Sequence, residues 1–108
     1  MSVSPKLAEN VFTALSYETV AASQTAQVLG TAGAAGDVLA GILVVPATTS
    51  PGNVILLDNA ISITVFVGGT VSDLKPFWIP LGIRSVSGAF KLTTGTNVSA
   101  VCVGEWNT

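Results

Sequence analysis

The hydrophobic pattern of the chain centres on residues 53–68, which read NVILLDNAISITVFVG. Two runs of β-branched and aliphatic residues flank Asp58 and Asn59, which both tolerate the left-handed backbone of a tight two-residue turn. This pattern predicts a β-hairpin in which Leu56 lies opposite Ile61. A four-residue loop would leave the same side chains on each face.

Neither face of the predicted hairpin is polar enough to meet only water. One face is wholly apolar and is expected in the core: Val54, Leu56, Ile61, Ile63, Val65 and Val67. The opposite face is also rich in apolar residues: Ile55, Leu57, Ala60, Ser62, Thr64 and Phe66. We therefore expect Ile55, Leu57 and Phe66 to contribute to a protein interface.

Other strand-length segments lie on both sides of the hairpin, separated by turns rich in Gly, Pro, Thr and Asn. Residues 38–45 (VLAGILVV) are apolar at every position, which is typical of a strand covered on both sides. Residues 75–84 (KPFWIPLGIR) contain two prolines, which remove ladder donors and indicate a sheet edge. Further candidate strands are 20–29, 85–92 and 98–106. No segment has the pattern of a crossover helix, so we predict an all-β fold, an antiparallel, jelly-roll-like β-sandwich.

The first 17 residues (MSVSPKLAENVFTALSY) differ from the rest and predict an N-terminal arm or short helix before a single domain at 18–108. Their apolar spacing fits a weakly amphipathic helix or an extended arm. A frayed terminus is the simpler alternative. An arm that docks on a neighbouring subunit or scaffold would use four apolar residues: Leu7, Val11, Phe12 and Leu15.

Trp78 stands between Pro76 and Pro80 in the predicted edge segment. The alternation of side chains there places it on the outer side of the strand. It could contact another protein, or it could be tucked under the N-terminal arm of its own chain. We include Trp78 among the expected interface residues.

The composition also indicates that the protein associates with other proteins. Hydrophobic residues make up 49% of the 108-residue chain and charged residues only 9%, against about 25% charged in an ordinary soluble domain. So few charges cannot cover a free monomer well, and we expect other subunits to cover part of the surface. The alternative is a monomer coated with Ser and Thr hydroxyl groups.

Several partners are not expected from the sequence. Only four side chains are Lys or Arg and the net charge is -2, so there is no basic patch for a nucleic acid. The longest aliphatic interval, residues 38–57, contains Pro46 and Pro51, which argues against a membrane-spanning helix. No secretory signal is visible near the N-terminus. The single cysteine, Cys102, lies in an apolar run and is expected to be a buried core residue.

The sequence offers little material for catalysis. The absence of histidine excludes Ser-His-Asp and Cys-His catalysis, and with one cysteine it excludes ordinary zinc sites. The six carboxylates are scattered, so we expect neither an enzyme nor a bound metal or cofactor. A carbohydrate-binding module remains a rival, because Tyr17, Trp78 and Trp106 could stack on sugars. The residues near Trp78, however, are prolines and aliphatics rather than the amides and acids that bind hydroxyl groups.

Two consecutive runs carry a resemblance to a known class of protein. They are GDVLAGILVVPATTSPGNVILLDNAISITVFVGG and PFWIPLGIRSVSGAFKLTTGTNVSAVCVGEW, which together extend over residues 36–106. In style and segment order they resemble small virion proteins of tailed bacteriophages, of the head decoration or cement type. A small tail, fibre or adaptor component of the virion is an alternative within the same class.

The resemblance implies a role without catalysis. Decoration proteins of this type form trimers on the outer surface of the capsid, bind the major capsid protein through an N-terminal arm and stabilise the head. The expected location is the virion, assembled in the cytoplasm of the host. The expected partners are copies of the same chain and the major capsid protein or another virion protein.

Overall fold

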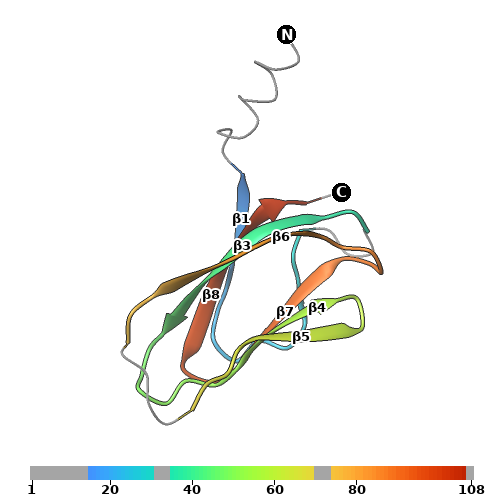
Figure 1. Cartoon of the computed structure of the whole chain (residues 1–108). Coiled ribbons are helices and arrows are strands. Elements are labelled where there is room, and N and C mark those ends of the chain that lie inside the picture. The colour runs from blue at the N-terminus through green and yellow to red at the C-terminus, as the bar shows by residue number, and fades with distance from the viewer. Residues whose placement is uncertain (1–14, 31–34, 70–73, 107–108) are drawn as a thin grey trace, which may run out of the picture.

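The computed structural model describes residues 15–30, 35–69 and 74–106, which form two four-stranded sheets packed face to face (Figure 1). Sheet A contains, from edge to edge, β1 (Ser16–Val20), β8 (Val98–Glu105), β3 (Val38–Pro46) and β6 (Phe77–Arg84). Sheet B contains, in the same sense, β2 (Gln27–Val28), β7 (Phe90–Thr94), β4 (Val54–Asp58) and β5 (Ile61–Phe66). All strand pairs are antiparallel.

This arrangement confirms the predicted antiparallel β-sandwich. Every connection except the β4–β5 hairpin crosses from one sheet to the other. Strands adjacent in the sequence therefore mostly face each other across the core. The jelly-roll-like connectivity remains an interpretation of the strand orders 1-8-3-6 and 2-7-4-5.

The core lies between the two sheets and is made by alternate residues of the central strands. In β8 the alternation is complete from Val98 to Gly104, with every second residue buried. It resolves the sequence ambiguity in this strand, because Val98, Ala100 and Cys102 face the core. The remaining fully buried apolar side chains are Val20, Leu29, Leu39, Ile42, Val44, Val54, Leu56, Ala89, Phe90 and Leu92.

The central hairpin is present, but its predicted register is wrong. The turn is formed by Asn59 and Ala60, so Asp58 pairs with Ile61 and Leu56 pairs with Ile63. Asn59 adopts the left-handed backbone with φ 58°. Asp58 belongs to the strand because its buried carboxylate binds backbone N–H groups of the β6–β7 connection.

A bulge changes the side of the hairpin on which Phe66 lies. The register shifts between Val54 and Ile55, so core-facing Val54 pairs with Phe66. Phe66 therefore packs at the margin of the core rather than on the outer face expected from the sequence. Its ring lies 5.3 Å from that of Phe77 in β6, centroid to centroid.

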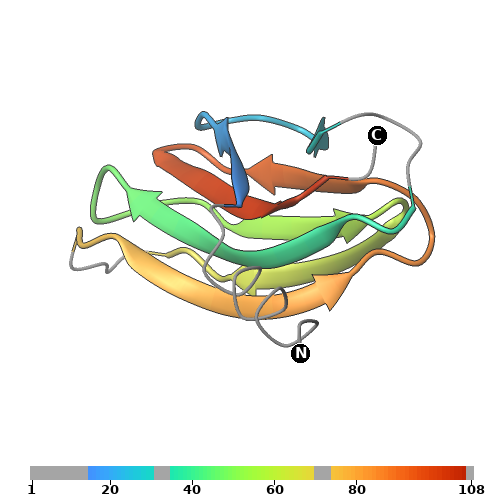
Figure 2. The same cartoon turned by 90° about the horizontal axis from the view of Figure 1, so that it is seen from above.

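The predicted burial of the hairpin's apolar face also needs correction at its β5 end. Ile61 and Ile63 lie on the core side of sheet B, yet they are 53% and 43% exposed. β5 and β6 are both edge strands and lie along the same side of the sandwich (Figure 2). With no strand beyond them, side chains of β5 are only partly covered.

The N-terminal part of the domain differs from the prediction. β1 begins at Ser16 and therefore includes the last two residues of the predicted arm. The predicted strand at 20–29 is split into the end of β1 and the short β2, because Ser23 and Ala26 adopt left-handed backbone angles between them. Among the expected arm contacts, Leu7, Val11 and Phe12 lie outside the described residues, whereas Leu15 is exposed.

β6 is the last strand of sheet A, so residues 75–84 lie at a sheet edge, as Pro76 and Pro80 predict. β3 lies between two strands of sheet A, but only one of its sides faces the core, and the outward side chains Leu43 and Val45 are half-buried. The prediction that this strand is covered on both sides is therefore wrong for the single chain. In the part of the chain that the structure describes, no helix is long and apolar enough to cross a membrane.

Candidate protein-binding surface

The outer face of sheet A is almost entirely apolar. Because side chains alternate along a strand, the residues between the core positions point away from the core. Two rows run across all four strands in register, from β1 through β8 and β3 to β6. One row consists of Tyr17, Val103, Gly41 and Pro80, and the next of Thr19, Val101, Leu43 and Trp78.

We call these eight residues, together with Val45 and Ser99 of the following row, the A face. The aliphatic members at its centre, Leu43, Val101 and Val103, are only half-buried. Tyr17 and Trp78 are exposed at its two edges. None of the ten residues carries a charge. Transfer of this surface from water into contact with another apolar surface is therefore favourable.

The indole of Trp78 lies over the neighbouring strand rather than pointing into solvent. A Cβ atom on Gly41 would stand only 2.3 Å from Cζ2 of Trp78. The ring therefore fills the space that a side chain at position 41 would occupy, and Gly41 is buried beneath it. Trp78 thus covers Gly41 and is itself 46% exposed.

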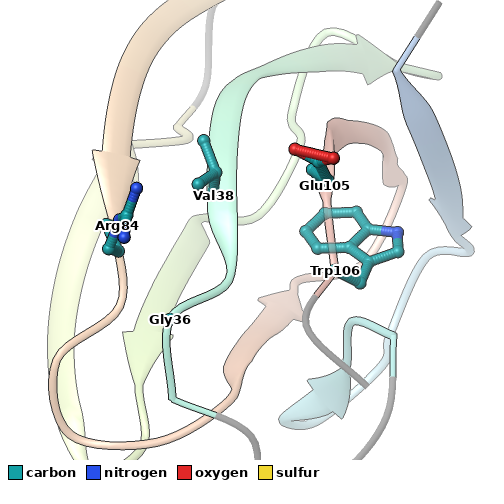
Figure 3. Close-up of a pocket in the computed structure, with 5 residues that line it drawn as sticks. All are labelled: Gly36, Val38, Arg84, Glu105 and Trp106. Atoms are coloured by element: carbon teal, nitrogen blue, oxygen red, sulfur yellow. The ribbon is translucent and has the colours of Figure 1, made fainter.

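One end of the A face carries a pair of opposite charges. Val38 pairs with Arg84 of β6 on one side and with Glu105 of β8 on the other. A hollow of about 380 Å³ is lined by Gly36, Val38, Arg84, Glu105 and Trp106 (Figure 3). Both charged side chains are exposed, so an external partner can reach them.

The outer face of sheet B is more polar, although the sequence analysis placed the interface there. Ile55 and Leu57 are half-buried on this face. Their neighbours in register are hydroxyl-bearing or charged: Ser62, Thr64, Lys91 and Thr93. The apolar stripe is therefore only one strand wide.

The predicted interface residues are not brought together on one surface. Trp78 lies on the A face, Ile55 and Leu57 lie on the opposite side of the sandwich, and Phe66 lies at the margin of the core. The aliphatic centre of the A face was not among the interface residues predicted from the sequence. Two signals pointed to it, namely the uninterrupted apolar run at 38–45 and the apolar character of both faces at 98–106.

Two of the described acidic side chains, Glu18 and Asp58, accept hydrogen bonds from other segments of the chain. Glu18 accepts hydrogen bonds from the backbone N–H of Gly30 at 3.0 Å and from Nε2 of Gln27 at 2.9 Å, which ties β1 to β2. Asp58 accepts bonds from the N–H groups of Val86 and Ser87 at 3.0 and 3.1 Å. Among the described residues, no group of three or more potential ligands is placed to hold a metal ion.

Cys102 is buried at the centre of the core, as the sequence predicts. Burial raises the pKa of its thiol to about 12, with a further contribution from the negative charge of Glu18. The thiol therefore stays protonated and unreactive near neutral pH.

Comparisons with protein-family models, curated proteins and solved structures gave no match.

Proposed function

We propose that this chain is a structural protein of a bacteriophage virion, a decoration protein that binds the outer capsid surface as an oligomer and stabilises the head. The observation that carries the proposal is the A face, an uncharged and largely apolar surface that extends across four strands. A protein that works by covering its neighbours needs such a surface and needs no catalytic group. The resemblance of residues 36–106 to decoration proteins supports the same role.

The binding free energy of a decoration protein is the sum of many separate contacts with its neighbours. Each subunit buries apolar area against its neighbours at roughly 25 cal/mol per Å², from which the entropy of association must be subtracted. One contact can be weak, because many copies on one shell act together through multivalency. The trimer implied by the resemblance is part of this proposal, as is attachment through the N-terminal residues.

A sedimentation assay with empty capsid shells stripped of this protein tests the proposal. We expect the full-length chain to sediment with the shells, to saturate them and to raise their melting temperature. No binding at saturating concentrations of the chain would refute a decoration role.

Substitutions in the N-terminal segment test the mode of attachment. In the full-length chain, Val11→Asp combined with Phe12→Asp should abolish binding to the shells, since a charge opposes burial of an apolar arm. Thr49→Asp, in the exposed loop at 47–50, introduces the same side chain as a control and should bind normally. Equal binding by all three proteins would contradict attachment through this segment.

Sugar binding is the second candidate function, because Trp78 is exposed. Its neighbours on the A face, Leu43 and Pro80, offer no side-chain hydrogen bonds to hydroxyl groups, which favours a protein partner. A glycan array distinguishes the two functions. Binding that is lost in Trp78→Ala would support the sugar-binding alternative, whereas an array without signal favours the structural role.

A further inference from the structure

The A face ends in a charge pattern that suits a second copy of the same chain. Arg84 and Glu105 lie in one row, on the two strands that flank β3, with Val38 between them. Two strand spacings separate β6 from β8, which amounts to about 10 Å. Figure 3 shows the two side chains on opposite sides of Val38. The arrangement places a positive charge on one side of the central strand and a negative charge on the other.

A rotation axis that runs parallel to β3, in front of the A face, makes this pattern self-complementary. Rotation about such an axis brings the β6 side of one copy to the β8 side of the next. Arg84 of the first copy then faces Glu105 of the second. The same rotation places Trp78 and Pro80 against the aliphatic centre of the neighbouring A face, which contains Val101 and Val103.

We propose, on the basis of the oligomeric role suggested above, that copies of this chain associate through the A face, with Arg84 of each copy paired to Glu105 of the next. The occupant of the A face is thus another copy of the protein. Burial of the uncharged rows supplies the affinity, and the two charges fix the orientation of the copies.

The dimensions of the A face are compatible with the proposed trimer. Four strands at about 4.8 Å give a sheet roughly 19 Å wide, and three such sheets enclose a triangle whose centre is about 5–6 Å from each sheet. Packed sheets lie about 10 Å apart, so side chains from one sheet reach about half that distance. Three copies can therefore fill the space between their A faces, whereas four would leave a hole at the centre.

The sheet B surface offers no comparable pattern. Its outer positions on β4 and β7 pair hydroxyl groups and Lys91 with a narrow apolar stripe, Ile55 and Leu57. No described acidic side chain points outward from the central strands β7 and β4 to match Lys91, since Asp58 is buried at its strand end. Lys91 is consequently a matched control position for a change of charge.

The test is a charge exchange in the full-length protein, followed by sedimentation at low ionic strength, where charge effects are least screened. We expect Arg84→Glu and Glu105→Arg each to weaken self-association about tenfold or more, because like charges then face each other. The double variant Arg84→Glu/Glu105→Arg restores opposite charges between copies and should recover most of the affinity. Lys91→Glu has the same change in net charge as Arg84→Glu, and it should associate like the wild type.

The proposal is overturned if the wild-type chain stays monomeric at about 100 μM, a concentration well above the micromolar range of modest interfaces. It is also overturned if Arg84→Glu and Lys91→Glu weaken self-association equally, or if the double variant does not recover self-association. The unfolding midpoint of each variant is measured in parallel, so loss of the fold is not mistaken for loss of association. An oligomer that is insensitive to Arg84→Glu but still binds capsid shells refutes the A face as the self-association site and leaves the decoration role standing. An oligomer that depends on these two charges but does not bind capsid shells supports the A face as the self-association site and refutes the decoration role.

Discussion

The ring of Trp78 in the edge strand β6 occupies the side-chain space of Gly41 in the central strand β3. A Cβ atom at position 41 would lie 2.3 Å from the ring and 2.6 Å from the backbone oxygen of Ile79. Glycine at position 41 is therefore a packing requirement. The ring of Trp78 can occupy this position over β3 only because residue 41 has no side chain.

Replacement of this glycine should destabilise the sandwich. We expect Gly41→Ala to lower the free energy of unfolding by about 1–3 kcal/mol, since the added methyl overpacks against both the ring and the backbone. Urea unfolding measures the change. Gly69→Ala is the matched control, because a Cβ there meets nothing within 4 Å, and it should change stability by less than about 0.5 kcal/mol. Equal effects of the two substitutions would contradict the packing described for Trp78.

The carboxylate of Asp58 anchors the connection between β6 and β7 to the end of β4. Its two oxygens accept hydrogen bonds from the N–H groups of Val86 and Ser87. We expect Asp58→Ala to cost about 2–4 kcal/mol, because it removes two bonds to a charged, buried acceptor. Asp58→Asn retains one oxygen acceptor and should cost less. Chemical denaturation of the three proteins should give this order, and an Asn variant less stable than the Ala variant would argue against the assigned bonds.

Ser85 holds the start of β3 against the end of β6. Its buried hydroxyl accepts hydrogen bonds from the N–H groups of Gly36 at 2.9 Å and Asp37 at 3.1 Å. Ser85→Ala leaves these donors without that acceptor, and we expect a loss of about 1–3 kcal/mol in thermal or urea unfolding. Ser87→Ala removes an exposed hydroxyl two residues away and should be close to neutral. A neutral Ser85→Ala variant would show that other groups satisfy both donors.

The raised pKa of Cys102 makes stability depend on pH in the alkaline range. The thiol ionises near pH 9.0 when it is exposed by unfolding, and only near pH 12 in the folded protein. Between these values the unfolded state releases a proton that the folded state keeps, so stability falls as pH rises. By linkage, ionisation of the thiol in the unfolded state should lower the free energy of unfolding by about 3 kcal/mol at pH 11.

Urea unfolding at a series of pH values from 8 to 11 measures this effect. Cys102→Ala is the control, because it retains every other titrating group but lacks the thiol. The difference in unfolding free energy between the two proteins should change with pH in favour of the variant. A constant difference across this range would contradict the burial of the thiol.

For some residues, a local feature of the sequence was enough to predict their place in the structure. The two prolines of residues 75–84 place this segment at a sheet edge, because a missing N–H group cannot serve a central strand. The isolated cysteine without histidine or a cationic neighbour is found in the core. The absence of a helical period after residue 17 left only sheets as the means of burying alternate apolar residues.

The hairpin illustrates where local reasoning failed. Its two strands were evident from their β-branched residues, but the register depended on Asp58, whose side-chain partners lie 28 and 29 residues away in the sequence. The bulge beside Val54 then moved Phe66 to the other face. The alternation of residues within the hairpin does not predict either feature. Both faces of the hairpin contain many apolar residues, so either register would bury a similar set of apolar side chains.

Composition and alternation are properties of the chain that do not depend on strand order, so they already predict an antiparallel β-sandwich with more apolar residues than its core needs. The location of the surplus apolar residues depends on which strands become neighbours in the folded protein. The A face exists because β1, β8, β3 and β6 are neighbours in space, although they are drawn from nearly the whole length of the chain. Hydrogen bonding between distant strands sets that order, so no single stretch of residues encodes the surface.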